Sequence, residues 1–201
     1  MKMSRLLTSF AALFLSLSLT ACENPLPEVS YPQLRFNHLP AIKLDVAKIE
    51  ILEKYQSPLQ APNVEHKLPL APATAMRNWA EDRLRAPGIS GVARFIIIDA
   101  SVKAEALAKK KGLKAAFTIE QSTRYRARLS AKLEVETAGG LGKGFAEAKS
   151  SRQRTMPEDV SINDRDDALY IFVEAAAIDF DKAMVQNIEK YLGPYFLSRK
   201  I

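Results

Sequence analysis

The chain has 201 residues and a formal charge of +6, with 47% hydrophobic and 26% charged residues. These proportions indicate a globular protein, and the length suits one domain of ~100–150 residues with a tether. Cys22 is the only cysteine, which excludes a disulfide within the chain, so the fold must be stabilised by its core. The mild cationic excess is compatible with anionic lipid nearby and equally with a role in solubility.

The N-terminus has the pattern of a secretory leader. Lys2 and Arg5 precede an uncharged run over residues 6–21, which ends in Leu-Thr-Ala-Cys at 19–22. The run is too short and too rich in Ser and Thr to span a bilayer well, which takes ~20 apolar residues. The last four residues resemble the lipobox of bacterial lipoproteins. That resemblance implies a lipid on the thiol of Cys22 and removal of residues 1–21 as a signal peptide; a plain secretory signal is the alternative.

Residues 22–41 are rich in proline and predict an extended tether, at ~3.1 Å per residue. Glu23 follows the cysteine. By resemblance to enteric lipoproteins, an Asp there would retain the protein in the inner membrane. Its absence favours the outer membrane, with the domain facing the periplasm. We expect a single folded domain over residues 42–201.

Residues 42–52 predict the first strand. Apolar residues stand at even positions up to Val46 and at odd positions from Ile49. Such a shift would turn the buried face outward unless a bulge absorbs it, so we predict a β-bulge at residues 47–48. Residues 56–71 are interrupted by prolines and predict a loop.

Residues 72–85 predict a helix, because Pro72 suits a first turn and the apolar residues recur every three or four positions. Glu81 and Arg85 are spaced to form a weak pair. Trp79 could stack on a ligand, but the favoured interpretation is that it anchors the helix on the sheet. The apolar stripe comprises Met76, Trp79, Ala80 and Leu84.

Residues 92–106 predict the second strand. Phe95 and Ile97 make both faces apolar near its start, which favours a central place in the sheet. The basic segment that follows, to about residue 116, is either a solvated turn or a contact with phosphates. One face of the strand is expected to hold Ile96, Ile98, Ala100, Val102 and Ala104.

Residues 117–135 show the clearest periodicity in the chain, because their large apolar side chains stand at odd positions and their charged side chains at even ones. This pattern predicts a half-buried antiparallel strand. Gly139-Gly140 can form a two-residue turn, and that turn places Lys132 opposite Glu147. The next strand, residues 143–155, has few large apolar groups. Its charges are typical of an edge strand.

Residues 161–192 predict a long closing helix. Ser161 and Asp164 suit its start, and Gly193-Pro194 follow its end. The helix is long enough to cover one face of the sheet. Its apolar stripe comprises Leu169, Val173, Ala176, Phe180, Met184, Ile188 and Tyr191.

Catalytic, metal-binding and cofactor-binding patterns are missing from the sequence. His38 and His66 have no further ligand at metal spacing. The glycine-rich stretch 139–144 departs from the Walker spacing and precedes a strand. The acidic residues from Asp164 to Asp167 lack the glycine and distal glutamate of a calcium loop. We therefore expect no catalytic residue, metal or cofactor, and a protein that is not an enzyme.

One candidate site is cationic. Arginine guanidinium groups bind phosphates and carboxylates in bidentate fashion. The alternative is a solvated polar face, balanced by nearby glutamates. The candidate anionic-ligand residues, all on one side of a predicted strand, are Arg124, Arg126, Arg128 and Lys132.

The predicted order is β-α-β-β-β-α, an α+β fold with an antiparallel-rich sheet of about four strands packed against two helices. With the lipobox, this order resembles the lipopolysaccharide-assembly lipoprotein family. The similarity lies in residues 125–129, the glycine turn, the strand ending at Arg152–Arg154 and the acidic helix start at Asp164. It implies a non-enzymatic accessory that supports an outer-membrane β-barrel in lipopolysaccharide or lipid transport.

Two alternatives remain open. One is an auxiliary lipoprotein of an envelope ABC-type lipid transporter, which shares a related strand–helix plan. The other is a structural envelope lipoprotein without lipid cargo. In each case we expect a membrane anchor and an envelope protein partner, with anionic lipid as a candidate ligand and no nucleic acid.

Overall fold

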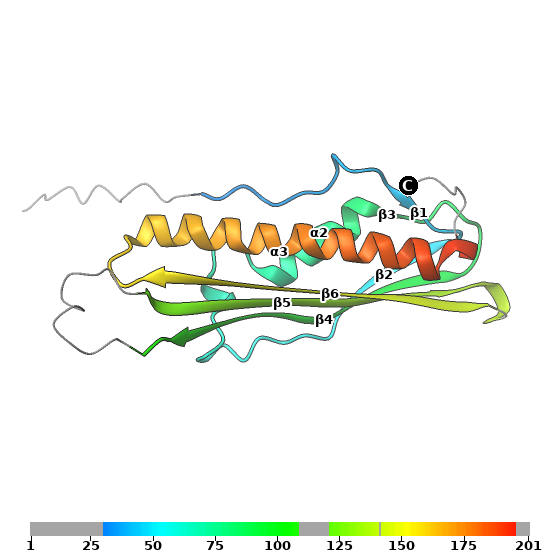
Figure 1. Cartoon of the computed structure of the whole chain (residues 1–201). Helices are drawn as coiled ribbons and strands as arrows, with labels where there is room; N and C mark the ends of the chain where they lie inside the picture. Colours follow the sequence, from blue (N-terminus) through cyan, green and yellow to red (C-terminus); the bar gives the residue numbers. More distant parts are fainter. Residues whose placement is uncertain (1–29, 109–120, 141, 196–201) are drawn as a thin grey trace, which may run out of the picture. The chain divides into compact units, whose positions relative to one another are not determined.

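The computed structural model describes residues 30–108, 121–140 and 142–195. The chain divides into two compact units, and the second, Tyr31–Ile201, holds all the elements described here (Figure 1). The strands are β1 (Ile42–Lys43), β2 (Lys48–Glu53), β3 (Leu84–Arg85), β4 (Val92–Ala106), β5 (Gln121–Glu136) and β6 (Lys143–Pro157). The α-helices are α2 (Pro72–Arg83) and α3 (Ile162–Tyr191), and short 3-10 turns lie at Glu65–Lys67, Ala138–Gly140 and Gly193–Tyr195.

The main sheet has four strands in the order β2-β4-β5-β6. β2 pairs with β4 in parallel, whereas the β4–β5 and β5–β6 pairs are antiparallel. Both helices pack on the same face of this sheet (Figure 1). The fold is therefore α+β, with an antiparallel-rich sheet against two helices, as the sequence predicts.

The prediction of one bulged strand over residues 42–52 is wrong. β1 pairs with β3 in a separate two-stranded sheet, and β2 joins the main sheet through β4. Between them the backbone bonds elsewhere: Leu44 N donates to Arg85 O (3.0 Å) and Ala47 N donates to Ser90 O (3.0 Å). The shift in apolar phase thus marks the passage from one sheet to another. α2 ends at Arg83, two residues earlier than predicted, because Leu84 and Arg85 form β3. The Arg85 side chain donates to the backbone oxygen of Glu81 and does not form the predicted pair with the Glu81 carboxylate.

The core centres on Trp79, which is fully buried. Its ring lies 5.3 Å from that of Phe95 on β4 and 5.5 Å, edge-on, from that of Phe180 on α3. The indole Nε1 donates to Asp181 Oδ1 (2.7 Å), and the same carboxylate pairs with buried Arg83 (3.1 Å). Trp79 is therefore the anchor between helices and sheet.

β4 is central, as predicted, but its buried face differs. The register shifts between Ile97 and Asp99, where a β-bulge interrupts the pairing with β5. Phe95 and Ile97 are buried before it, and Ala100 and Val102 after it. Ile98, predicted to share a buried face, is instead 46% exposed because it is the extra residue of the bulge.

The β5–β6 hairpin has the predicted register, with Lys132 opposite Glu147. The connection spans residues 137–142 instead of two residues, and Thr137 N donates to Gly142 O (2.9 Å). Gly139 there has a φ of 69°, which favours glycine. The longer turn is centred on the same residues, so the pairing is unchanged. β6 is an edge strand of the sheet, as predicted.

α3 begins as predicted, since the Ser161 side chain accepts a hydrogen bond from Asp164 N (3.1 Å). The predicted stripe is buried except for Tyr191, which is 53% exposed. Its 30 residues span ~45 Å at 1.5 Å per residue. The predicted basic segment at 109–116 lies outside the described residues.

Candidate binding surface on the sheet

The face of the main sheet opposite the helices carries the predicted cations. On β5 the odd-numbered residues from Ala127 to Val135 are buried toward the helices. The even-numbered ones therefore point to the opposite face, which no helix of the described chain covers (Figure 1). We call this side the outer face.

The structure does not join the four predicted cations into one site. Arg126 Nη1 lies 3.6 Å from Glu105 Oε1. Lys132 Nζ lies 2.9 Å from Glu134 Oε1 and 4.4 Å from the centre of the Phe145 ring. The hydrogen bond to Glu134 raises the pKa of Lys132. Both cations are therefore already partnered.

Arg124 and Arg128 differ from that pair. The Arg124 Nε is buried without a hydrogen-bond partner among the described residues. Arg128 is exposed and forms no ion pair with any described residue. Of the predicted four, Arg128 is the cation most available to a ligand.

Arg128 borders a hollow of about 520 Å³ on the outer face. Strand register explains its shape, because one row across the sheet reads Asp99, Ser130, Lys149 and the next reads Ser101, Arg128, Ser151. Small serines thus lie between long charged side chains. We call it the serine hollow; its lining comprises Ile98, Asp99, Arg128, Leu129, Ser130, Glu147, Lys149, Ser150 and Ser151.

Of the residues that line the hollow, only Arg128 was a predicted site residue. Lys149 is exposed and, among described residues, has no ion pair. It could have been found, since the predicted hairpin register already places it beside Arg128. Ile98 could not, because the bulge that turns its side chain outward has no sequence signal that we recognise. Bulges often redirect side chains at binding sites.

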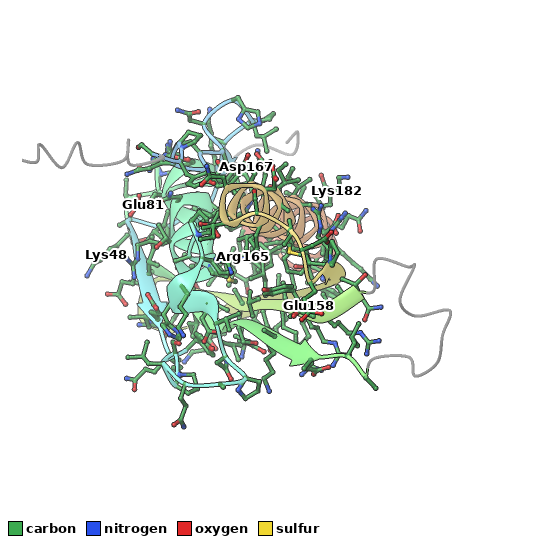
Figure 2. All side chains as sticks on the ribbon, turned by 90° about the vertical axis from the view of Figure 1, so that its left-hand side faces the viewer. Lys48, Glu81, Glu158, Arg165, Asp167 and Lys182 are labelled. Carbon is green, nitrogen blue, oxygen red and sulfur yellow. The ribbon has the colours of Figure 1, made fainter. Side chains whose placement is uncertain are left out.

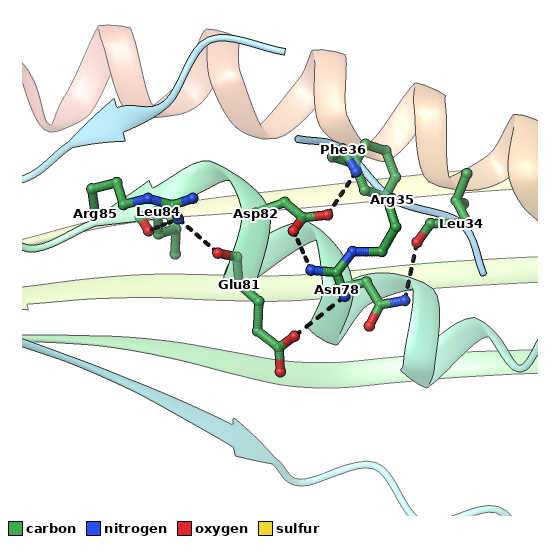
Figure 3. Close-up of polar contacts among 8 residues, drawn as sticks. All are labelled: Leu34, Arg35, Phe36, Asn78, Glu81, Asp82, Leu84 and Arg85. Atoms are coloured by element: carbon green, nitrogen blue, oxygen red, sulfur yellow. Dashed lines mark hydrogen bonds and ion pairs between the residues drawn. The ribbon is translucent and has the colours of Figure 1, made fainter. Parts of the chain in front are cut away.

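A second feature is the strap, residues 31–40, which packs on the helices. Asn78 Nδ2 donates to Leu34 O (3.0 Å), and Phe36 N donates to Asp82 Oδ2 (2.7 Å) (Figure 3). Arg35 pairs with Asp82, and more loosely with Glu81 at 3.6 Å. The Phe36 side chain is 2% exposed, so the strap contributes to the core.

The start of the strap is held by α3. The Tyr31 ring stacks on Tyr170 at 5.4 Å, and its hydroxyl donates to Asp167 Oδ1 (2.7 Å). That hydrogen bond raises the pKa of Tyr31 to about 12. Figure 2 shows Asp167 on α3. The predicted tether, residues 22–41, is therefore corrected: the compact unit begins at Tyr31 rather than at residue 42.

Cys22 lies outside the described residues. Within the described ranges no cluster of three or more His, Cys, Asp or Glu side chains could hold a metal ion. No helix in that part of the chain is both long and apolar enough to cross a membrane. His38 and His66 are exposed.

No family model and no curated protein matches the chain. Among solved structures it is similar to protein XCC0632 from Xanthomonas campestris, of the DUF330 family. The two share 9% identity over 77% of this chain and 88% of that one, with a TM-score of 0.32. A likeness at this level assigns neither a family nor a function.

Proposed function

We propose that this protein is a lipid-anchored, non-enzymatic accessory of the bacterial outer membrane. It faces the periplasm and acts by binding, in lipopolysaccharide or lipid transport. The sequence support is the predicted leader, residues 1–21, which comes directly before Cys22. The structural support is the serine hollow, with its unpaired cations, on an outer face free of helices among the described residues.

The strap is the observation that carries the proposal. Only eight residues, 23–30, lie between the lipid-bearing Cys22 and the docked Tyr31, so nine Cα–Cα steps join the two. Nine fully extended steps reach roughly 30 Å. An acyl group on Cys22 therefore keeps the domain beside the membrane, where its outer face meets envelope lipid and protein. The expected partner is a barrel or transporter protein of the envelope.

Labelling of cells with an alkyne analogue of palmitate tests the anchor. The wild-type protein is expected to take up label and to sediment with outer membranes in a sucrose gradient. Cys22→Ser should lose the label and retain its leader. The matched control, Cys22→Ser with Ser30→Cys, restores a thiol outside the motif and should also stay unlabelled. Label that persists in Cys22→Ser would refute the anchor.

Photo-crosslinking from the outer face tests the binding role. A crosslinking residue at Ser151 is expected to capture an envelope protein in intact cells. One at Lys190, on exposed α3 surface, serves as the control position. Equal capture from both positions would contradict the outer face as the binding surface.

A further inference from the structure

The serine hollow carries charges of both signs. Arg128 and Lys149 supply two cations, and Asp99 and Glu147 supply two carboxylates. None of the four forms an ion pair with a described residue. A purely anionic ligand would leave both carboxylates facing it. The charges instead suit a ligand that carries a negative and a positive group together.

Strand register sets the places of these charges. Arg128 faces Ser151 across β5–β6, which makes Lys149 its diagonal neighbour. Diagonal neighbours lie about 7–8 Å apart between Cα atoms, within reach of two long side chains. A phosphate between them can accept hydrogen bonds from both, and the arginine fork suits phosphate geometry.

Asp99 lies on the other side of Ser130, on β4. Its Oδ1 accepts a hydrogen bond from Ser101 N (3.0 Å), which orients the carboxylate. Glu147, by contrast, lies close enough to Lys132 to help raise the pKa of that lysine. Asp99 is therefore the carboxylate that remains for a ligand cation.

Ile98 adds an apolar contact. The bulge leaves its side chain 46% exposed at the rim of the hollow. An acyl chain attached to a bound head group would cover it and remove apolar surface from water. Phosphate, ammonium and hydrocarbon are joined in this way in a phospholipid with an ethanolamine head group.

We propose that the serine hollow binds the phosphoethanolamine head group of a membrane phospholipid. Arg128 and Lys149 hold the phosphate, Asp99 accepts the primary ammonium, and Ile98 contacts the start of an acyl chain. The inference rests on the proposed membrane location, and it names the ligand class of that surface.

Native mass spectrometry of the full protein purified from membranes in detergent tests this. The probe is an equimolar mixture of phosphatidylethanolamine, phosphatidylglycerol and phosphatidylcholine with identical acyl chains. An exposed ion pair is worth up to about 1 kcal/mol, or about fivefold in affinity. We expect bound ethanolamine lipid to exceed each of the other two by about threefold to fivefold.

Four variants separate the contacts. Asp99→Asn should lose the preference and bind ethanolamine and glycerol lipids equally. The double variant Arg128→Gln, Lys149→Gln should weaken binding of all three lipids, and Ile98→Ser should weaken all three without changing their ratio. Arg126→Gln is the matched control, because Arg126 lies on the same strand, pairs with Glu105 and is not among the residues that line the hollow. It should leave lipid binding unchanged.

Equal or preferred binding of phosphatidylglycerol by the wild type would overturn the proposal in favour of a simple anion site. Loss of preference in Arg126→Gln, or its retention in Asp99→Asn, would overturn it as well. So would the absence of retained lipid. Palmitate labelling is a separate readout, so a failed anchor and a wrong ligand class are distinguishable.

Discussion

Glu65 is a buried carboxylate that forms no ion pair with any described residue, and its replacement tests how the loop before α2 is held. It is 4% exposed. Its Oε1 accepts hydrogen bonds from the hydroxyls of Tyr55 and Ser57, the latter at 2.7 Å. Its Oε2 accepts from Val102 N on β4 (3.2 Å) and from Asn63 Nδ2 (3.3 Å). Every partner is a donor, so the site requires two acceptor oxygens.

Glu65→Gln keeps the shape of the side chain but replaces one acceptor with a donor. If the amide nitrogen takes the Oε2 position, it faces Val102 N–H and the Asn63 amide. A buried donor left unsatisfied costs about 1–3 kcal/mol, and the remaining bonds lose their charge assistance. We expect the free energy of unfolding to fall by about 3 kcal/mol.

Urea unfolding followed by fluorescence of Trp79, the only tryptophan, measures this loss. Glu189→Gln, on exposed helix surface, is the control and should change stability by less than about 0.5 kcal/mol. A loss below about 1 kcal/mol in Glu65→Gln, with an unchanged denaturant slope, would refute the reasoning.

The same carboxylate predicts an acid-dependent loss of stability. Burial raises the pKa of Glu65, but the hydrogen bonds from Tyr55 and Ser57 outweigh it and hold the pKa below its ordinary value of 4.5. A pKa lowered by folding adds stability above the unfolded-state pKa, and this is lost as pH falls through the folded-state value. Wild-type stability should therefore drop below pH 4.5, and Glu65→Gln should show a shallower drop.

Three further substitutions test other parts of the structure. Asp82→Asn weakens the hold on the strap and should cost about 1–2 kcal/mol, with faster amide exchange across residues 31–40; unchanged exchange would contradict a docked strap. Gly88→Ala places a Cβ 2.5 Å from a backbone nitrogen and should cost about 1–3 kcal/mol, whereas Gly193→Ala, with nothing within 4 Å, should cost far less. Arg152→Gln removes an exposed pair worth less than about 1 kcal/mol; because Arg152 lowers the pKa of Asp179, NMR titration should show that pKa rise.

Regular periodicity determined much of the fold in advance. Three features were predicted from the spacing of apolar residues: the alternation along β5, the apolar stripe of α3, and the start of β4, which is apolar on both faces. Each spacing places the apolar side chains of one element on the face that packs in the core. The symmetry of the β5–β6 hairpin placed Lys132 opposite Glu147 although the turn is longer than two residues. These features are local, so the sequence alone carries them.

The candidate site depended on contacts between distant residues. The shift in apolar phase that suggested a bulge at residues 47–48 marks the passage of the chain from one sheet to another. The bulge that the structure contains in β4 lies at Ile98, where the sequence pattern does not predict one. Charged residues looked alike in sequence. Only their neighbours show that Arg126 and Lys132 are paired, whereas Arg128 and Lys149 form no ion pair with any described residue. Proline content predicted a free tether through residue 41, but residues 31–40 dock on the helices through contacts with Asp82 and Tyr170.

For this protein, the sequence by itself determined the α+β class, the long hairpin and the closing helix, because backbone periodicity is a property of neighbouring residues. Only the tertiary structure decided where the strap ends, which cations are unpaired and where the serine hollow forms. Those properties depend on which side chains from separate segments come within a few ångströms of one another. Such contacts join residues that are far apart in the sequence, so no local sequence pattern predicts them.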